Sequence, residues 1–479
     1  MPDNKKNVEF YGGWVTTFVP VLVFLGFCIL YFVVFKAFDM HALAMGALIG
    51  LMIGALLTKR DGDNSYWSAV YEGVKEAVPV AILLLIIGMF SQMIKVSQLS
   101  SGFIWLAETL SINGGLFTAV TFLFTAIIAA ATGSSIGTLF TAFPIFFPAG
   151  VLLGSHPAAL AGALISGAIF GDNVAPISDT TIISAGTQEY TTKHGFAEIA
   201  GAVVNRMPYA LISGVIAFSL FWIFGGSNTR EVVTSEIFQG NASTLVMLVP
   251  VVIMLFMAIK TRNIYFAITI GIILGIIVGL ISNVMAPSDI LAVEDGIPTG
   301  FLTDGVSEIM GTVVLVLSVY GIMGVLEKAE ALNKITDKIY TSAMGRTDKG
   351  TELAMMIGIT LTTIIFGGVT SASMTTFGKV QNELGKRANL HPYRRALLLD
   401  GFANALGVMI PFLSVFIFIG SQLTQGYEFV RAVPATTISI YMFYSAVLFL
   451  ILLISVVTGW GRSYEGNNGE KRKIPHRKV

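Results

Sequence analysis

Two aspartates, Asp172 and Asp179, stand seven residues apart in a part of the chain that is otherwise mostly apolar. The segment 171–181 that contains them also carries amide and hydroxyl side chains on both sides of a proline: Asn173, Pro176, Ser178, Thr180 and Thr181. A charged residue at the centre of a bilayer costs about 2.5–3.5 kcal/mol on insertion scales. A chain that keeps two carboxylates in such surroundings is therefore expected to use them to bind a charged species.

The chemistry that fits this segment is the binding of a hard cation or a proton. Pro176 disfavours a continuous helix, because its ring removes one backbone donor and clashes with the preceding turn. An unwound segment presents carbonyls beside the carboxylates and hydroxyls, and hard cations are held by several such oxygen ligands. We therefore expect Asp172 and Asp179 to be ligands of Na⁺, while burial also favours the protonated form of a carboxyl group. The alternative, that the two aspartates only cap helix ends, stays open because Asp is a favourable N-cap.

Two runs of small residues resemble each other although they lie far apart in the chain. Their glycine and hydroxyl residues are Gly133, Ser134 and Ser135 in the first run, and Gly368, Thr370 and Ser371 in the second. Small hydroxyl residues can coordinate a cation or place a helix N-terminus near an anion. They also let helices pack closely in membranes. The runs are therefore candidate ligand segments, with close helix packing as the alternative.

Further polar residues lie in or next to other apolar stretches. Asp400 and Asn404 are four residues apart and would share one face of a helix. We expect Asn404 to contribute to the polar site and Asp400 to pair with the arginines at 394–395. Arg206 is expected to reach the membrane interface or to pair with Glu198.

Composition places the chain among membrane proteins. Of its 479 residues, 54% are hydrophobic and 12% are charged, whereas a soluble domain carries about 25% charged residues. The formal net charge is zero, which gives no reason to expect nucleic acid as a partner. The sequence has no metal-binding His/Cys spacing, no phosphate-binding glycine loop and no nucleophile motif. We therefore expect neither an enzyme nor a bound cofactor.

Successive apolar runs predict an all-α polytopic membrane protein with about twelve transmembrane helices, judged against about 20 residues for each crossing. The predicted spans are 14–35, 41–57, 77–94, 116–131, 158–170, 203–224, 244–260, 264–282, 310–326, 352–367, 394–407 and 433–458. Four segments are rich in Gly, Ser, Thr and Pro: 132–148, 171–186, 368–380 and 408–425. Irregular backbone at membrane depth is tolerated only where protein or a cavity surrounds it, so these segments are predicted to be re-entrant or unwound.

The two halves of the chain repeat one another. Gly133 and Gly368 are 235 residues apart (368 − 133), and Pro176 and Pro411 have the same separation (411 − 176). One offset at both places predicts two homologous halves in which these four residues break helices at equivalent points. Chance similarity between Gly/Ser/Thr-rich runs is the alternative.

Loop charges indicate that the two halves are inverted, because Lys and Arg mark cytoplasmic loops. Lys59 and Arg60 follow the second span, whereas the loop after the equivalent eighth span has no Lys or Arg. The segment after the third span has only Lys95, but its counterpart after the ninth span is basic, with Lys328, Lys334, Lys338, Arg346 and Lys349. Inverted repeats with interrupted helices are typical of secondary transporters, whose binding sites lie where the halves meet.

The basic ends of the chain place both termini in the cytoplasm. The expected organisation is a cytoplasmic tail, a first transmembrane repeat, an external linker, a second repeat and a basic cytoplasmic tail. Their ranges are 1–13, 14–224, 225–243, 244–458 and 459–479.

The run from Phe170 to Thr181 resembles the signature of the NhaC family of sodium:proton antiporters, in which Gly-Asp is followed by Pro and then by Ser-Asp-Thr-Thr. The stretch 393–400 is also similar to a pattern in the second half of that family. The resemblance implies a bacterial or archaeal plasma-membrane transporter of the ion-transporter superfamily with Na⁺/H⁺ coupling. Some members exchange or co-transport organic substrates, such as malate against lactate, or amino acids. The site residues that the resemblance implies are Asp172, Ser178, Asp179 and Thr180.

The first hypothesis is a Na⁺(Li⁺)/H⁺ antiporter in which Asp172 and Asp179 alternate between protonated and Na⁺-bound states. Hydroxyl groups from both repeats would complete the site: Ser134, Ser135, Thr370 and Ser371. The second hypothesis is a Na⁺- or H⁺-coupled carrier of a small carboxylate or an amino acid. The expected partners are Na⁺, H⁺ and the lipid bilayer, and a homodimer is left open.

Overall fold

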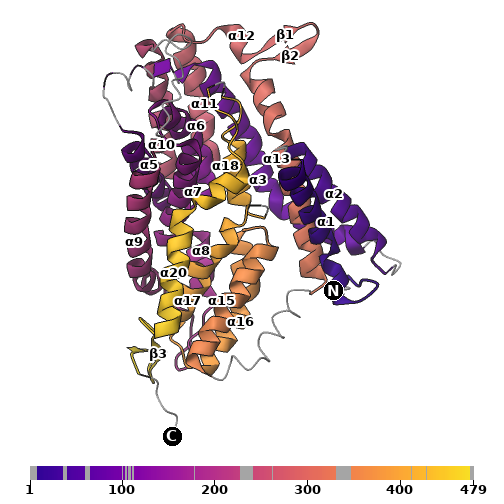
Figure 1. The fold of residues 1–479 in the computed structure, drawn as a ribbon, viewed down its shortest axis with the longest axis vertical. Coiled ribbons are helices and arrows are strands. Elements are labelled where there is room, and N and C mark those ends of the chain that lie inside the picture. Colours follow the sequence, from indigo (N-terminus) through magenta and orange to yellow (C-terminus); the bar gives the residue numbers. More distant parts are fainter. Residues whose placement is uncertain are drawn as a thin grey trace.

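The computed structural model of the chain is almost entirely helical, with one short β-hairpin near each end of the molecule (Figure 1). It describes residues 8–35, 40–59, 65–99, 101–102, 105, 109, 113–176, 178–226, 241–261, 263–330, 347–411, 413–427 and 429–474. The helices of the first half are α1 (Val19–Ile29), α2 (Met40–Leu56), α3 (Ser65–Val96), α5 (Gly114–Thr132), α6 (Ser135–Leu152), α7 (Pro157–Val174), α8 (Asp179–Gly186) and α9 (Ile199–Phe224).

The second half begins with α10 and has the same kind of elements. Its helices are α10 (Leu248–Thr261), α11 (Ile264–Ile281), α12 (Pro287–Ile290), α13 (Phe301–Lys328), α15 (Asp348–Ile365), α16 (Thr370–Arg387), α17 (Pro392–Ala403), α18 (Val415–Gln422), α19 (Ala435–Ile440) and α20 (Phe443–Thr458). The hairpin strands are β1 (Ala292–Glu294) with β2 (Ile297–Thr299), and β3 (Tyr464–Glu465) with β4 (Lys471–Arg472). Short 3₁₀ turns span Trp14–Phe18, Ala242–Met247 and Leu406–Met409, and a π turn spans Leu30–Val34.

Several of these helices can cross a membrane, so the chain is a multi-pass helical membrane protein. Six described helices have the required length and apolar composition: Ala77–Val96, Gly114–Thr132, Ser135–Leu152, Pro157–Val174, Ile199–Phe224 and Phe301–Lys328. Five more are apolar but shorter: Trp14–Ile29, His41–Leu56, Ala242–Met254, Tyr265–Ile281 and Phe443–Thr458.

The four segments predicted to be re-entrant or unwound are mostly helical, so unwound backbone is limited to short stretches within them. In the first half, Gly133–Ser134 alone separates α5 from α6, and residues 175–178 separate α7 from α8. In the second half, α16 is regular from Thr370, and the described residues of 404–414 between α17 and α18 form only a short 3₁₀ turn, Leu406–Met409. Two of the serines, Ser134 and Ser414, cap α6 and α18 with their side chains. The two prolines of α6 lie inside a membrane-type helix, where neighbouring groups compensate for the lost hydrogen bonds.

Helices α5 to α8 have counterparts in α15 to α18 with similar local chemistry. Gly133 ends α5 and Gly368 follows α15, with φ of 68° and 77°, a left-handed conformation that glycine adopts without strain. His156 and His391 lie 235 residues apart (391 − 156), and each side chain caps the following helix by accepting a backbone N–H. A proline follows each histidine at the first helical position, where proline is favoured.

The two helical hairpins approach the middle of the molecule from opposite ends. Figure 1 shows α5 and α6 toward the upper end and α15 and α16 toward the lower end, where both ends of the described chain also lie. At the end of the first hairpin away from its turn, Ser155 forms an isolated antiparallel β-bridge with Gly226. At the corresponding end of the second hairpin, Leu390 forms such a bridge with Tyr464. The tips of both hairpins therefore point toward the centre.

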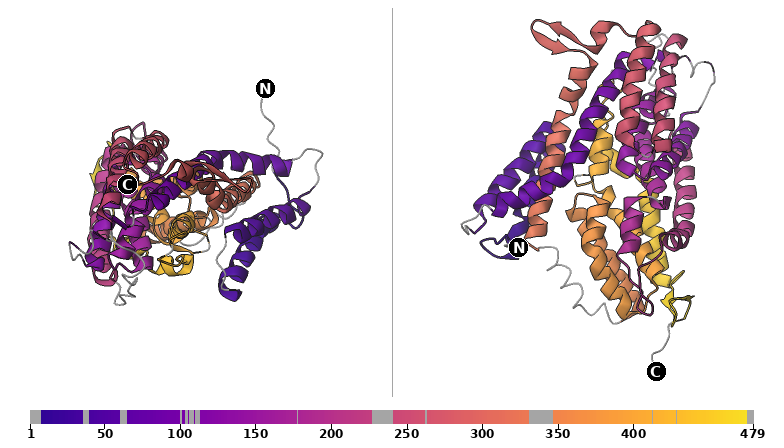
Figure 2. Two further views of the ribbon diagram at one scale, coloured as in Figure 1. Left: turned by 90° about the horizontal axis from the view of Figure 1, so that it is seen from above. Right: turned by 180° about the vertical axis from the view of Figure 1, so that it is seen from behind.

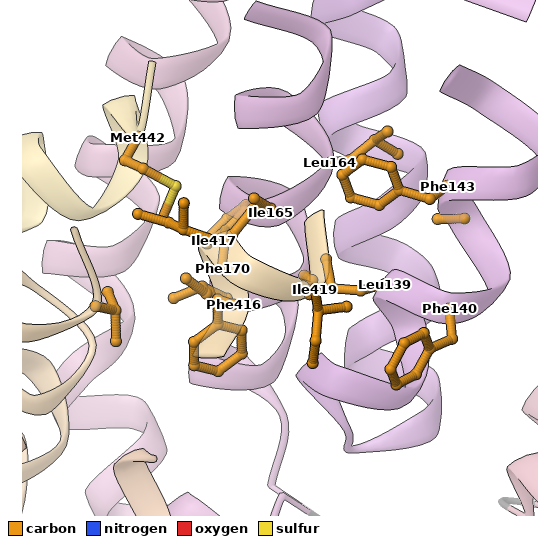
Figure 3. Close-up of a cluster of buried hydrophobic side chains, with 14 of the residues drawn as sticks. Leu139, Phe140, Phe143, Leu164, Ile165, Phe170, Phe416, Ile417, Ile419 and Met442 are labelled. Carbon is orange, nitrogen blue, oxygen red and sulfur yellow. The ribbon is translucent and has the colours of Figure 1, made fainter. Parts of the chain in front are cut away.

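In each half, the short helix that follows the interruption packs against helices of the other half. Helix α8 packs against α16 and α17, whereas α18 packs against α6 and α7. Figure 3 shows the second of these contacts as a cluster of buried side chains from three helices, among them Leu139, Phe140, Ile165, Phe416 and Ile419. The two halves therefore contact each other next to both interruptions.

Helices α3 and α13 form a close pair that stands with α1 and α2 at one side of the molecule (Figures 1 and 2). Their backbones touch at glycines. A Cβ on Gly73 would lie 2.1 Å from the carbonyl oxygen of Tyr320, and a Cβ on Gly88 would lie 2.2 Å from that of Gly305. Such contacts are typical of tightly packed membrane helices, so α3 and α13 form a closely packed pair, the α3–α13 arm.

Replacing Gly73 with valine should destabilise the protein, because the new side chain would overlap the backbone of α13. Overpacking of this kind typically costs about 1–3 kcal/mol, so we expect a lower apparent Tm in detergent, measured by tryptophan fluorescence. Gly26→Val in α1 is the matched control, since a Cβ on Gly26 would meet no atom within 4 Å. An equal loss of Tm in both variants would contradict the close α3–α13 contact.

Candidate functional site

The interruption between α7 and α8 is the centre of the candidate site. Helix α7 ends at Val174 and α8 begins at Asp179, and between them lie Pro176 and the extended residue Ala175 (φ −74°, ψ 124°). A helix end leaves its last carbonyl groups without donors from the same helix. The hydroxyl of Thr181 donates to the Ala175 carbonyl at 2.9 Å. This bond crosses the interruption and holds its shape.

Asp172 lies in the last turn of α7 and is buried, with 1% of its surface exposed. Thr180 Oγ1 donates to Asp172 Oδ2 at 3.5 Å and is hydrogen-bonded to Ser178 Oγ at 2.8 Å. The hydroxyls of Ser178 and Ser135 also lie beside the Asp172 carboxyl group. Within the described structure, Asp172 Oδ1 has no hydrogen-bond partner. One oxygen of a buried carboxylate is thus left for a ligand.

The adjacent residue Asn173 is fully buried. Neither its Oδ1 nor its Nδ2 has a hydrogen-bond partner among the described residues. A buried polar group left unpaired costs about 1–3 kcal/mol, so such groups usually contact an ion, a water or a ligand. Asp172 and Asn173 together make the end of α7 the candidate binding position.

Asp179 differs from Asp172 because its side chain is exposed. Its Oδ1 accepts from the Thr180 backbone N–H at 2.8 Å and from the Ser178 hydroxyl at 3.5 Å. A carboxylate in the first turn of a helix is stabilised by the helix dipole. The sequence pattern predicts two desolvated carboxylates, but only Asp172 is buried, since the turn at Pro176 leaves Asp179 at the protein surface.

The tip of the first hairpin lies against this interruption. Gly133 makes the turn, and Ser134 caps α6 by accepting from the Gly137 N–H at 3.1 Å. The hairpin packs tightly on α7, because a Cβ on Gly171 would lie 2.0 Å from the Ala126 carbonyl oxygen. This contact sets the start of α6, including its hydroxyls, next to the end of α7.

The second interruption is the segment 404–414 between α17 and α18, and the tip of the second hairpin lies against it. Thr370 begins α16 and is buried, and Ser371 is half-buried. The Val415 N–H donates to the Gly367 carbonyl at 2.9 Å, which joins this tip to the start of α18. Pro411 lies in the irregular segment just before α18.

Helix α16 runs beside α8 in the same direction. Gly378 faces Thr187 at the end of α8, and farther along both chains the Glu189 N–H donates to Asn382 Oδ1 at 2.9 Å. Helix α8 begins eight residues before Thr187, and α16 begins eight residues before Gly378. Because the rise per residue is the same in both helices, their N-termini lie at about the same level. Among the described residues, no hydrogen bond links the start of α16 to Asp172.

A second group of buried polar residues lies beside the first interruption. Asp400 of α17 is fully buried and forms an ion pair with Arg206 of α9, which is 2% exposed. Asn404 Nδ2 donates to Asp400 Oδ1 at 2.8 Å, and the Ser184 hydroxyl of α8 donates to Asp400 Oδ2 at 3.0 Å. The structure thus places Asn404 with Asp400 rather than directly at Asp172.

The ion pairs predicted for Asp400 and Arg206 from sequence neighbours were wrong. The arginines at 394–395 instead approach Glu352 and Glu465, at 2.7 and 3.7 Å. Glu352 belongs to α15 and Glu465 to β3, so helix packing rather than closeness in the chain selects the partners. Sequence reasoning also gave no role to the two polar residues that connect the Arg206–Asp400 pair to the interruption and to α8, Thr181 and Ser184. The signal that could have found them is a polar residue type inside an apolar helix.

The arrangement around Asp172 can hold either a proton or a hard cation. Hydroxyl, amide and carbonyl oxygens next to a carboxylate are the ligands that such cations prefer. Over the described part of the chain, no group of three or more His, Cys, Asp or Glu could hold a metal ion. A cation bound beside Asp172 would be held by one buried carboxylate together with neutral oxygens.

Comparison with known proteins gives a consistent result. The family model described as the Na⁺/H⁺ antiporter family matches residues 8–190, which include the first interruption. An uncharacterized Na⁺/H⁺ antiporter of Haemophilus influenzae is 24% identical over 378 residues, which cover 72% of this chain and 76% of that protein. The Na⁺/H⁺ antiporter NhaC of Alkalihalophilus pseudofirmus is 32% identical over 139 residues, 29% of each chain. The malate-2H⁺/Na⁺-lactate antiporter of Bacillus subtilis is 23% identical over 214 residues, 44% of this chain and 45% of that protein.

The different exposure of the two aspartates predicts different reactivity of cysteines placed there. Cys28 is the single cysteine of the chain and is buried, so a substituted protein reports on its new thiol. Because exposure controls thiol reactivity, we expect a polar maleimide to label Asp179→Cys at least about tenfold faster than Asp172→Cys. The rates are measured by mass shift of the purified protein in detergent, with the unsubstituted protein as the control. Equal rates at the two positions would contradict the burial of Asp172.

Proposed function

Since the chain belongs to the Na⁺/H⁺ antiporter family as an NhaC-type member, we propose that Asp172 is the group that binds Na⁺ and H⁺ in turn. An antiporter needs a site that either ion can occupy but that both cannot occupy together. The observation that carries the proposal is the Asp172 carboxyl, which is buried and has one oxygen without a partner in the described structure.

The physical reason for exchange is the cost of a bare charge in the protein interior. An isolated ionised carboxylate is strongly disfavoured away from water. A proton removes the charge of Asp172, and a Na⁺ ion compensates for it, but a protonated carboxyl is a poor cation ligand. Each ion therefore displaces the other, and the empty charged site is the least favourable state. Coupling follows, because the protein changes conformation most readily with one of the two ions bound.

The ligands that we propose for Na⁺ surround Asp172. They are the hydroxyl oxygens of Ser135, Ser178 and Thr180, the amide oxygen of Asn173, and backbone carbonyls of the interruption. This proposal rests on their burial or closeness to the carboxyl group. Hydroxyl and amide groups near the hairpin tips and the second interruption are proposed to complete the site during the cycle: Ser134, Thr370, Ser371 and Asn404. Asp179, being exposed, would attract cations from solution to the interruption.

The transport cycle that we propose is alternating access in a protein of twelve crossings built from two inverted repeats. The opposite directions of the two hairpins and the recurring caps support this arrangement. The bundle that contains both interruptions would move against the α3–α13 arm. We propose that the protein lies in the plasma membrane with both termini in the cytoplasm, and exchanges cytoplasmic Na⁺ or Li⁺ for external H⁺. The basic residues near the C-terminal hairpin support that orientation.

Asp172→Asn should abolish exchange, because an amide neither binds a proton at neutral pH nor compensates for the charge of Na⁺. The measurement is Na⁺-induced dequenching of a pH-gradient dye in everted vesicles from an antiporter-deficient host. Asp179→Asn should reduce the initial rate by about two- to fivefold, since an exposed charge acts mainly through attraction of the ion. Asp289→Asn is the control and should retain the wild-type rate, since Asp289 is a half-buried carboxylate in the first turn of α12 that accepts from the Ala286 N–H.

Two outcomes would contradict this assignment. Wild-type rates in the Asp172→Asn protein would show that another group carries the ions. Exchange that requires malate, lactate or an amino acid in the vesicles would show that an organic substrate takes part.

Competition at one carboxyl group also predicts how Na⁺ affinity depends on pH. Protons occupy Asp172 at acidic pH, so Na⁺ must displace them and the apparent KM for Na⁺ is high. In the acidic range the apparent KM should fall by about tenfold for each unit of increase in pH, as linkage requires for one displaced proton. The KM is obtained from initial rates at fixed pH on both sides of the membrane. A KM that is independent of pH would contradict direct competition.

A further inference from the structure

We propose that Arg206 is the positioning residue of this cation site, held in place by Asp400 of the other half and acting on the interruption through the hydroxyl of Thr181. The inference rests on the proposed function of Asp172. It concerns what fixes the geometry of the site rather than which ion occupies it.

The first step is the anchoring of Arg206. Its guanidinium is buried and forms an ion pair with Asp400, which is itself fully buried. Asp400 is further held by the Asn404 amide at 2.8 Å and by the Ser184 hydroxyl at 3.0 Å. Donors from α8, α9 and the end of α17 therefore converge on one carboxylate. A carboxylate with this many charge-assisted hydrogen bonds has a fixed position.

The second step runs from the guanidinium to the interruption. Arg206 Nη2 donates to Thr181 Oγ1 at 2.6 Å, and Thr181 Oγ1 in turn donates to the Ala175 carbonyl at 2.9 Å. Because a hydroxyl has one hydrogen, accepting from Arg206 directs that hydrogen to Ala175. The Ala175 N–H donates back to the Asp172 carbonyl at 3.2 Å. These bonds thus connect Arg206 to the backbone carbonyl of Asp172, the residue that carries the buried carboxyl group.

The chemistry of the side chain explains why an arginine stands here. A guanidinium has several donors in a rigid plane, so one nitrogen can bind Asp400 while another binds Thr181. A lysine at this position would have one nitrogen on a flexible stem and would lose the fixed angle between the two partners. Arg206 therefore acts as a rigid spacer between the two halves.

A second buried ion pair in the same protein serves as a comparison. Arg394 binds Glu352 with two hydrogen bonds, at 2.7 and 3.1 Å, and also donates to Ser455 at 2.8 Å. These partners join α17 to α15 and α20, and the described contacts of Arg394 do not reach the first interruption. A purely structural role for buried ion pairs would make the two arginines equivalent, whereas the proposal makes them different.

The first test replaces the hydroxyl that links Arg206 to the interruption. Thr181→Val should raise the apparent KM for Na⁺ by about tenfold, the usual effect of losing an outer-shell partner of an ion site, with the maximal rate retained within about twofold. Thr181→Ser restores the hydroxyl and should restore the KM. Thr125→Val is the matched control, since Thr125 is buried in α5 and its hydroxyl donates to the carbonyl of Thr121 in its own helix. A wild-type KM in Thr181→Val, or the same defect in Thr181→Ser, would overturn the proposal.

The second test addresses the charges. Arg206→Lys should raise the KM for Na⁺, whereas Arg394→Lys should not. The double variant Arg206→Gln with Asp400→Asn removes both charges and leaves no unpaired one. If the pair served only to neutralise itself, this double variant would have the wild-type KM, and the proposal would be wrong. We expect its KM to stay raised, because the rigid link to Thr181 is lost.

A readout that does not depend on transport separates this inference from the proposed function. Hydrogen–deuterium exchange of peptides covering residues 171–182 should be faster in Thr181→Val than in the wild type and in Thr125→Val. Unchanged exchange in Thr181→Val would overturn the positioning role even if Na⁺/H⁺ exchange is confirmed. Faster exchange in a protein that does not exchange Na⁺ for H⁺ would retain the positioning role and reject the proposed function.

Discussion

A carboxylate placed where water does not reach must have its charge compensated, and this constraint organises the centre of the molecule. Asp172 is buried in the last turn of α7, and the interruption that follows brings hydroxyls and carbonyls beside it. The same constraint explains Asp400, which is compensated permanently by Arg206. One buried aspartate thus has a fixed partner, and the other has an oxygen without a hydrogen-bond partner among the described residues. That difference separates a group that holds the structure from a group that can take part in exchange.

The two halves depend on each other for the shape of this site. Helix α8 of the first half rests on α16 and α17, and α18 of the second half rests on α6 and α7. The ion pair between α9 and α17 crosses the same boundary. A shift of one half relative to the other would therefore act on both interruptions. The close α3–α13 pair stands beside this bundle.

The sequence predicted what local chemistry decides. The apolar run 264–282 appears as α11, and Pro176 lies in an interruption, because hydropathy and the lost proline donor act within a few residues. Local patterns could not show that Asp179 is exposed, since this depends on how the turn directs the chain. Nor could they show the pairing of Arg206 with Asp400, which lie 194 residues apart and meet only through the packing of α9 on α17.

The most direct test of the central claim is proton release on Na⁺ binding by the purified protein. Saturating Na⁺ is added to the protein in weakly buffered detergent solution, and released protons are measured with a pH-sensitive dye alongside binding of radioactive Na⁺. Because a cation displaces the proton of its ligand, we expect release of about half a proton for each Na⁺ bound at the pH at which Asp172 is half protonated, rising toward about one as the pH is lowered. The Asp172→Asn protein should release none. Na⁺ binding without proton release, or equal release by the Asp172→Asn protein, would contradict the claim that both ions share this carboxyl group.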